Sequence, residues 1–231
     1  MRIPLFDVDG TIIPTGSNQV HQQAFEHAIK EIYKIEIKYE IGRNAGRVDK
    51  QVLKLLLLEQ KLSLNEIDSS LYKAIKAMEE YFTLNLDKVD IKLLPGVKEL
   101  LVKLKEKGCP VGLLTGNIEP IGWSKMEKLG IRDLFDFGAF GNLAERRVDL
   151  IDVAVKRAED IFGKKFNKTD FVIIGDTPRD IECAKLGGIQ CIAVATGNFS
   201  LEELKKCGAD LVVKSLEDSQ VVLDFLTLDK Y

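Results

Sequence analysis

Two carboxylates near the start of the chain have a spacing that suits catalysis. The segment Asp7-Val-Asp-Gly-Thr11 directly follows the short apolar run 3–6. Paired acids at the end of a strand can hold a hard cation such as Mg²⁺, which prefers oxygen ligands. They can also share the work of nucleophile and general acid. The alternative is a charged turn in which Gly10 supplies backbone freedom, but the spacing favours a functional pair.

A second candidate site is the tripeptide Thr115-Gly116-Asn117, which follows the apolar run 111–114. A hydroxyl, a glycine and an amide before a helix can cradle an anion, because backbone N–H groups at a helix start attract phosphate. The alternative is that Asn117 caps the helix. On the residues alone, the helix cap is the favoured interpretation.

Two further acids, Asp176 and Asp180, follow the apolar run 171–174. Pro178 suits the first turn of a helix, so Asp180 is expected in that turn, where it can face the same cation as Asp176. Acidic residues also favour helix N-termini for electrostatic reasons. The residues alone therefore leave both interpretations open.

The pair Arg146-Arg147 stands just before a predicted helix that begins at Leu150. A cation near a helix start opposes the helix dipole, which suggests an anionic partner for one of the two. The alternative is a solvated surface charge, and on the residues alone it is favoured.

The segments that must position these residues predict an α/β fold. Helical periodicity separates the later apolar runs, and such alternation is typical of a doubly wound, Rossmann-like parallel sheet. Continuous apolar runs suit a parallel sheet that is covered on both faces. The predicted strands are 3–6, 111–114, 136–139, 171–174, 190–194 and 211–213, and the predicted helices between them are 96–107, 118–129, 150–161 and 178–186.

The segment between the first strand and the rest of the sheet differs from its surroundings. It contains no good strand, and helical periodicity covers 20–33, 48–59 and 65–82. We therefore predict an all-helical insert at 16–89 within an α/β core made of 1–15 and 90–231.

The composition excludes several classes of protein. The 231 residues carry a net charge of −3, and no segment has the basic footprint of a nucleic-acid binder. No apolar run is long enough for a membrane span, and the N-terminus lacks a signal-peptide pattern. The four cysteines are not spaced like metal ligands. These features predict a cytoplasmic protein without nucleic-acid or membrane partners, and they do not indicate its oligomeric state.

Taken in order, the four candidate sites resemble the motifs of the haloacid dehalogenase (HAD) superfamily. Asp7-Val-Asp-Gly-Thr11 is similar to its first motif, Thr115-Gly-Asn117 to its second, an arginine to its third, and Gly175-Asp-Thr-Pro-Arg-Asp180 to its fourth. The helical insert resembles the cap of the phosphoglycolate phosphatase/β-phosphoglucomutase-like branch.

This resemblance implies a role for each residue. Asp7 would attack phosphorus and form an aspartyl-phosphate, and Asp9 would protonate the leaving oxygen and then activate water. Mg²⁺ would bind the Asp7 carboxylate, the Asp9 backbone carbonyl and Asp176, with Asp180 in support. The residues expected to bind the phosphoryl group are Thr115, Gly116, Asn117 and Arg147.

Two segments depart from the commonest family pattern. Arg147-Val-Asp-Leu150 matches the Arg-x-(Asp/Glu)-Leu form of the third motif, so we choose Arg147 over Arg146. In the insert, Gly46-Arg-Val-Asp49 resembles a Gly-Arg-Thr-Asp segment near the substrate, with Val48 in place of threonine. Arg47 is therefore a candidate substrate contact.

The leading hypothesis is a Mg²⁺-dependent phosphatase acting on a small phosphorylated metabolite, with a phosphoglycolate-like compound as one candidate. A phosphomutase of the β-phosphoglucomutase type would use the same four motifs. A protein that binds a phosphometabolite without turnover is the alternative from another class. Dehalogenases of this superfamily lack the second acid, so Asp9 disfavours dehalogenation.

Overall fold

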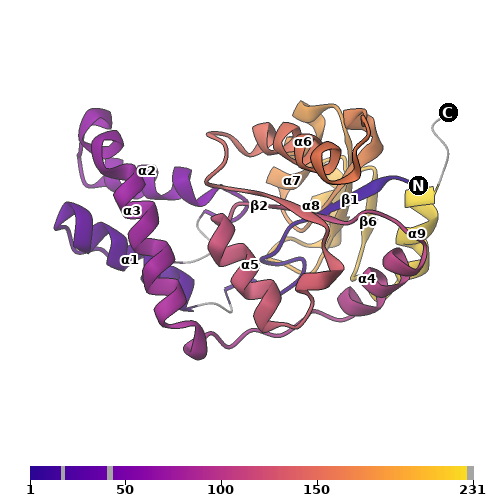
Figure 1. Ribbon diagram of the computed structural model, residues 1–231, viewed down its shortest axis with the longest axis horizontal. Coiled ribbons are helices and arrows are strands. Elements are labelled where there is room, and N and C mark those ends of the chain that lie inside the picture. The colour runs from indigo at the N-terminus through magenta and orange to yellow at the C-terminus, as the bar shows by residue number, and fades with distance from the viewer. Residues whose placement is uncertain (17–18, 41–43, 228–231) are drawn as a thin grey trace.

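A six-stranded parallel sheet with the strand order β3-β2-β1-β4-β5-β6 lies in the larger lobe of the molecule, where Figure 1 labels β1, β2 and β6. The computed structural model describes residues 1–16, 19–40 and 44–227. The strand order reverses between β1 and β4 in the middle of the sheet, and ligands bind at such a point in open α/β sheets. The strands are β1 (Ile3–Phe6), β2 (Gly112–Thr115), β3 (Phe137–Phe140), β4 (Phe171–Gly175), β5 (Gln190–Val194) and β6 (Leu211–Val213).

Each central strand contributes side chains to two separate apolar clusters. Leu5 of β1 and Ile173 of β4 lie in one cluster, whereas Phe6 and Ile174 lie in the other. This follows from the alternation of side chains along a strand. Since both faces are buried, the strands are continuously apolar, as the sequence predicted.

Helices cover both faces of the sheet. Buried residues of α4, α5 and α9 belong to one apolar cluster, and those of α6, α7 and α8 belong to the other. The predicted doubly wound α/β fold is therefore confirmed. These helices are α4 (Val97–Glu106), α5 (Glu119–Lys128), α6 (Leu150–Phe162), α7 (Pro178–Gly187), α8 (Leu201–Lys206) and α9 (Ser219–Thr227).

Three helices follow β1 before the chain returns to the sheet: α1 (Gln19–Tyr33), α2 (Asp49–Glu59) and α3 (Leu64–Leu84). They form a separate lobe at one end of the molecule (Figure 1). Their apolar side chains are continuous with the cluster on one face of the sheet. We refer to this lobe as the cap; its division from the core at 16–89 stays a proposal. None of the described helices is long and apolar enough to cross a membrane.

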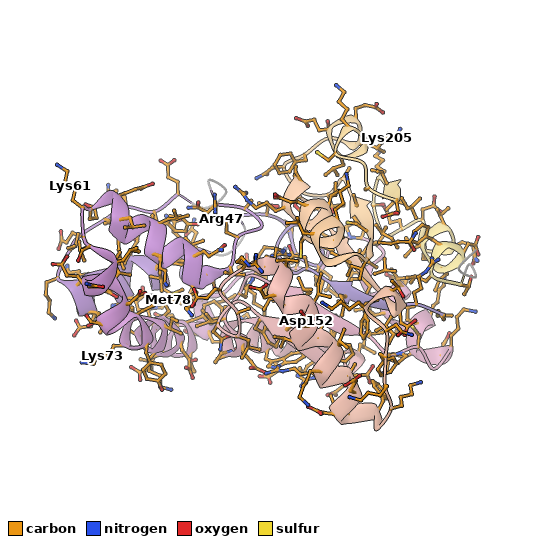
Figure 2. All side chains as sticks on the ribbon, turned by 90° about the horizontal axis from the view of Figure 1, so that it is seen from above. Arg47, Lys61, Lys73, Met78, Asp152 and Lys205 are labelled. Atoms are coloured by element: carbon orange, nitrogen blue, oxygen red, sulfur yellow. The ribbon has the colours of Figure 1, made fainter. Side chains whose placement is uncertain are left out.

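The strand register explains why distant residues meet. Phe6 at the end of β1 is paired with Leu113 of β2 and with Ile174 of β4. Because parallel strands end at the same edge of a sheet, the residues that follow these three strands lie close together. The cap joins the core at that edge, and Figure 2 shows Arg47 at the junction of the two lobes.

Candidate active site

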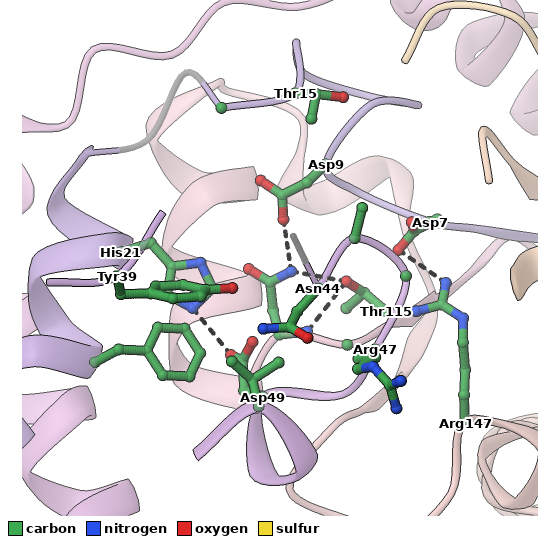
Figure 3. Close-up of a pocket in the computed structure, with 17 residues that line it drawn as sticks. Asp7, Asp9, Thr15, His21, Tyr39, Asn44, Arg47, Asp49, Thr115 and Arg147 are labelled. Carbon is green, nitrogen blue, oxygen red and sulfur yellow. Dashed lines mark hydrogen bonds and ion pairs between the residues drawn. The ribbon is translucent and has the colours of Figure 1, made fainter. Parts of the chain in front are cut away.

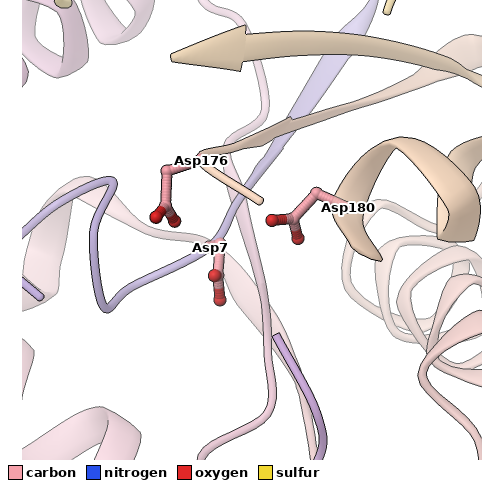
Figure 4. A group of neighbouring side chains, drawn as sticks. All are labelled: Asp7, Asp176 and Asp180. Carbon is pink, nitrogen blue, oxygen red and sulfur yellow. The ribbon is translucent and has the colours of Figure 1, made fainter. Parts of the chain in front are cut away.

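Three buried aspartates from separate segments meet at the carboxyl edge of the sheet (Figure 4). Asp7 follows β1, Asp176 follows β4, and Asp180 lies in the first turn of α7. Carboxylate oxygens of the three lie within 4.8 Å of one another. Gly10 makes this approach possible: it has a φ of +95°, and a Cβ there would lie 2.1 Å from Asp176 Oδ2.

The aspartate cluster concentrates negative charge in a buried place. Burial raises the pKa of Asp7, and Asp180 adds to this effect although Arg147 opposes it. Burial raises the pKa of Asp176 even further, with Asp180 and Asp7 as the next causes. Such a donor set fits a hard divalent cation, because a cation would relieve the repulsion and Mg²⁺ prefers carboxylate oxygens.

Arg147 supplies positive charge beside this cluster. Its Nη2 lies 3.1 Å from Asp7 Oδ1 and 2.5 Å from Asp180 Oδ1. Burial alone would lower the pKa of its guanidinium, but Asp180 and Asp7 outweigh burial and raise it. Arg146 instead lies on the surface and pairs with Asp149. The structure thus brings Arg147, and not Arg146, to the aspartates.

The start of α7 fixes the position of Asp180. Thr177 is the N-cap, and its hydroxyl donates to Asp180 Oδ2 at 2.7 Å while the Thr177 N–H donates to the same oxygen at 3.0 Å. In return, the Thr177 hydroxyl accepts from the Asp180 N–H. This capping box and Arg147 together occupy both oxygens of Asp180. Asp180 therefore takes part in the N-terminal capping box of α7 and also belongs to the aspartate cluster, so the two interpretations that the sequence left open are compatible.

Asp9 does not join the cluster through its side chain. Lys125 Nζ donates to both of its oxygens at 2.8 Å, and Asn117 Nδ2 donates to Oδ2 at 2.7 Å. Lys125 Nζ also donates to Asn117 Oδ1 at 2.5 Å. Burial would raise the pKa of Asp9, but Lys125, His21 and Asn117 together lower it. Asp9 is consequently held as a carboxylate.

Lys125 is the functional candidate that the sequence analysis missed. It is wholly buried on α5, on the face that also buries Ile121, Gly122 and Met126. The sequence does contain a signal for Lys125. A lysine at a position where helical periodicity predicts a buried apolar residue requires a buried partner of opposite charge.

The tripeptide Thr115-Gly116-Asn117 at the end of β2 lines a pocket and also contacts the cap. The Thr115 hydroxyl and Asn117 are buried and line a pocket with Asp7 and Asp9. Asn117 does not cap α5, whose N-cap is Ile118. Gly116 lies against the cap, since its carbonyl accepts from the Asp49 N–H at 2.8 Å. A Cβ on Gly116 would lie 2.0 Å from the Arg47 carbonyl oxygen.

A further contact that the sequence pattern does not predict links the cap with the core. His21 Nε2 lies 3.0 Å from Asp49 Oδ2, and that oxygen also accepts from the Ile118 N–H at 3.0 Å. The spacing of His21 from His27 in the sequence does not reveal this pair, because such spacing concerns only one helix. The pairing depends on residues 28 positions apart, which local periodicity cannot reveal.

The pocket lies between the aspartates and the cap (Figure 3). Asp7, Asp9 and Arg147 line its core side, and Phe25, Tyr39 and Val52 give its cap side an apolar part. Arg47 also lines the pocket. Among the described residues, Arg47 has no ion pair with a carboxylate.

Residues 4–194 match the family model described as haloacid dehalogenase-like hydrolase. The chain belongs to this family. The resemblance to the haloacid dehalogenase superfamily is therefore confirmed, and the family match spans β1, β2 and β4.

Known proteins of similar sequence or fold cover most of the chain. A Clostridium perfringens protein with the provisional name pyrophosphatase PpaX is 26% identical, over 94% of this chain and 95% of its own. A phosphoglycolate phosphatase of Aquifex aeolicus is 24% identical, over 87% and 88%. The crystal structure of CbbY from Rhodobacter sphaeroides in complex with phosphate has a TM-score of 0.72 at 20% identity, with 94% of this chain and 96% of that chain covered. The family match and the two sequence relatives identify the chain as an enzyme of the phosphatase kind, and the likeness to the CbbY structure agrees with the fold.

Proposed function

We propose that the protein is a Mg²⁺-dependent phosphatase that hydrolyses a small phosphorylated metabolite through an aspartyl-phosphate on Asp7. The observation that carries the proposal is the buried Asp7 carboxylate. It lies beside the Arg147 guanidinium and two further aspartates, and it opens into a pocket. Phosphoryl transfer requires mainly positioning and charge neutralisation, and this arrangement supports both.

In the first half-reaction, an Asp7 oxygen attacks phosphorus and the bond from phosphorus to the leaving oxygen breaks. A proton reaches the leaving oxygen from the Asp9–Lys125 pair, in which Lys125 Nζ lies 2.8 Å from Asp9. In the second half-reaction, Asp9 takes a proton from water, the water oxygen attacks phosphorus, and the bond to Asp7 breaks. Holding Asp9 as a carboxylate suits this basic role.

Phosphoryl oxygens would contact Arg147, the Thr115 hydroxyl and backbone N–H groups of Gly116 and Asn117. The residues that would hold Mg²⁺ are Asp7, the Asp9 carbonyl and Asp176, with Asp180 in support. The bound cation would reduce the repulsion between Asp7 and a phosphate dianion. A phosphoglycolate-like substrate is one candidate, consistent with the name of the Aquifex relative, and the cytoplasm remains the predicted location.

The test is phosphate release from p-nitrophenyl phosphate and from a panel of phosphorylated metabolites, with and without Mg²⁺. We expect Asp7→Asn to lower kcat by at least about a thousandfold, because the amide is a poor nucleophile. Asp160→Asn, an exposed aspartate on α6, is the matched control and should keep wild-type turnover.

Wild-type turnover by Asp7→Asn would contradict the nucleophile assignment. Isomerised hexose phosphate without phosphate release would instead indicate a mutase. Either result would require another account of the site.

A further inference from the structure

The loop that follows β5 lies against Asp176, although none of the four candidate motifs includes it. Residues 195–200 form this loop between β5 and α8. A Cβ on Gly197 would lie 1.7 Å from Asp176 Oδ2 and 2.7 Å from its Cγ. The φ of Gly197 is not positive, so its backbone conformation does not itself require glycine. Glycine is needed here because the backbone of the loop approaches the aspartate closely.

A second backbone segment confines the same carboxylate. A Cβ on Gly10 would lie 2.1 Å from Asp176 Oδ2 and 2.6 Å from Oδ1. The Thr11 hydroxyl donates to Oδ1 at 3.3 Å. Both oxygens of Asp176 therefore have close neighbours in the protein, from the loop after β1 and, through Gly197, from the loop after β5.

Thr196 joins these two loops to each other. Its hydroxyl donates to the Gly10 carbonyl at 2.6 Å, across 186 positions of the chain. The loop after β5 is in turn anchored to the sheet, because the Ala195 N–H donates to the Val213 carbonyl of β6 at 2.9 Å. Thr196 thus keeps the two glycine segments at a fixed separation around Asp176.

The Asp176 carboxylate has little freedom to turn. It points toward Asp7 (Figure 4). Rotation about its Cβ–Cγ bond would bring an oxygen against the glycine backbones, and the joined loops cannot move apart to make room, because interiors are close-packed. Asp180 is similarly constrained, since Arg147 contacts its Oδ1 and Thr177 contacts its Oδ2. Two of the three clustered aspartates are therefore unable to turn a second oxygen toward a cation.

Such rigidity distinguishes between divalent cations. Mg²⁺ requires octahedral geometry with oxygens at about 2.0–2.1 Å, whereas Ca²⁺ takes about six to eight oxygens at about 2.3–2.6 Å and often both oxygens of one carboxylate. A site that can neither widen nor supply a second oxygen from the same carboxylate suits the smaller ion.

We propose that Thr196 and Gly197 are positioning residues, which hold Asp176 rigid and thereby favour Mg²⁺ over Ca²⁺ at the aspartate cluster. Neither residue lines the active-site pocket, so their effect on a bound cation passes through Asp176. The proposal rests on the metal site of the proposed function, but it concerns metal binding alone and not phosphoryl transfer.

The test titrates Mg²⁺ and Ca²⁺ separately into the full chain by calorimetry, without substrate. We expect the wild-type chain to bind Mg²⁺ more tightly than Ca²⁺. Thr196→Val removes the hydroxyl and should reduce this preference, measured as the ratio of the two Kd values, by about twofold to tenfold, the equivalent of one hydrogen bond. Thr196→Ser keeps the hydroxyl and should retain the wild-type ratio to within about twofold.

Thr227→Val is the matched control, because the Thr227 hydroxyl also donates to backbone carbonyls, but within α9. This helix contacts the opposite edge of the sheet, where the Leu226 carbonyl accepts from the Arg2 N–H just before β1. The ratio of the two Kd values should be unchanged in this variant.

Gly197→Ala tests the close approach directly. The added Cβ would displace the Asp176 carboxylate and should weaken Mg²⁺ binding by about tenfold to a hundredfold, as for other residues that orient a metal ligand. Thermal unfolding without metal shows whether this variant is folded. If it is not, the two Thr196 variants decide the question alone.

Equal affinity of the wild-type chain for the two ions, or the same ratio in Thr196→Val and Thr196→Ser, would overturn the proposal. Absence of Mg²⁺ binding to the wild-type chain would overturn both this proposal and the proposed metal site. If the expected ratios are found but no phosphate ester is hydrolysed, the proposed phosphatase function fails and the positioning role of Thr196 and Gly197 stands.

Discussion

At the scale of single residues, Lys125 is the most informative feature. A wholly buried ammonium group is costly unless it is paired and hydrogen-bonded. Its described side-chain partners are the two Asp9 oxygens and Asn117 Oδ1. The pairing fixes the orientation of Asp9 relative to the end of β2, so Lys125 is a positioning residue for the proposed acid and base.

We predict that Lys125→Met lowers kcat by about a hundredfold, in the range for loss of general acid–base catalysis. KM should change by less than about threefold, because Lys125 does not line the pocket. Steady-state kinetics with p-nitrophenyl phosphate measures both. Lys128→Met is the control on the same helix, since among the described residues its ammonium donates to the carbonyls of Leu86 and Asp87 and not to a carboxylate. Equal kinetics in both variants would remove the positioning role.

The residues that the sequence singled out are those whose positions follow from a strand end. Asp7, Thr115 and Asp176 each stand directly at or after a predicted strand, and parallel strands bring such residues to one edge. Lys125 and Asp49 could not be placed in this way. Their partners depend on how α5 and the start of α2 pack, and that packing is set by contacts between segments far apart in the chain.

At the scale of elements, α7 and α8 both begin with a capping box, but the two boxes differ in the residues that they support. Thr177 and Asp180 form the capping box of α7, and Ser200 and Glu203 form that of α8. The α7 box is buried beside the active site, whereas the α8 box is exposed. Only the first one holds a residue that contacts Arg147.

We predict that Thr177→Ala lowers both stability and turnover, because Asp180 loses the hydroxyl that donates to its Oδ2. The free energy of unfolding should fall by about 1–2 kcal/mol, and kcat should fall by about tenfold as Arg147 loses its fixed partner. Ser200→Ala should lower stability by about 0.5–1 kcal/mol with unchanged kcat. Denaturant unfolding and kinetics separate the two effects, and a full kcat in Thr177→Ala would refute the link to Arg147.

The strands and the longer helices could be predicted because their patterns are local. The predicted strand 190–194 matches β5 in full, and the cap helices agree with α1, α2 and α3 to within two residues. The sequence pattern does not predict α8, which has six residues and thus too few turns to show a helical period. Helix α9 was not predicted either, although Val222, Leu223 and Leu226 bury one of its faces.

At the scale of the whole molecule, the cap and the core share one apolar cluster, so the cap does not rest on the core by polar contacts alone. The polar contacts between them nevertheless differ in kind. Asp49 is buried and contacts the Ile118 N–H, whereas Glu145 is exposed and pairs with Lys50 and Lys54. Exposed pairs contribute about 0–1 kcal/mol, so Asp49 should dominate closure.

We predict that Asp49→Ala opens the cap more often, because the Ile118 N–H and His21 lose their shared acceptor. Hydrogen exchange resolved to single amides should show about tenfold faster exchange at Ile118. The value of kcat/KM should fall by about tenfold, since catalysis requires the closed form. Glu145→Gln is the control and should leave both quantities within about twofold, even at low salt, where surface pairs are strongest. Unchanged exchange at Ile118 in Asp49→Ala would show that apolar packing alone holds the cap closed.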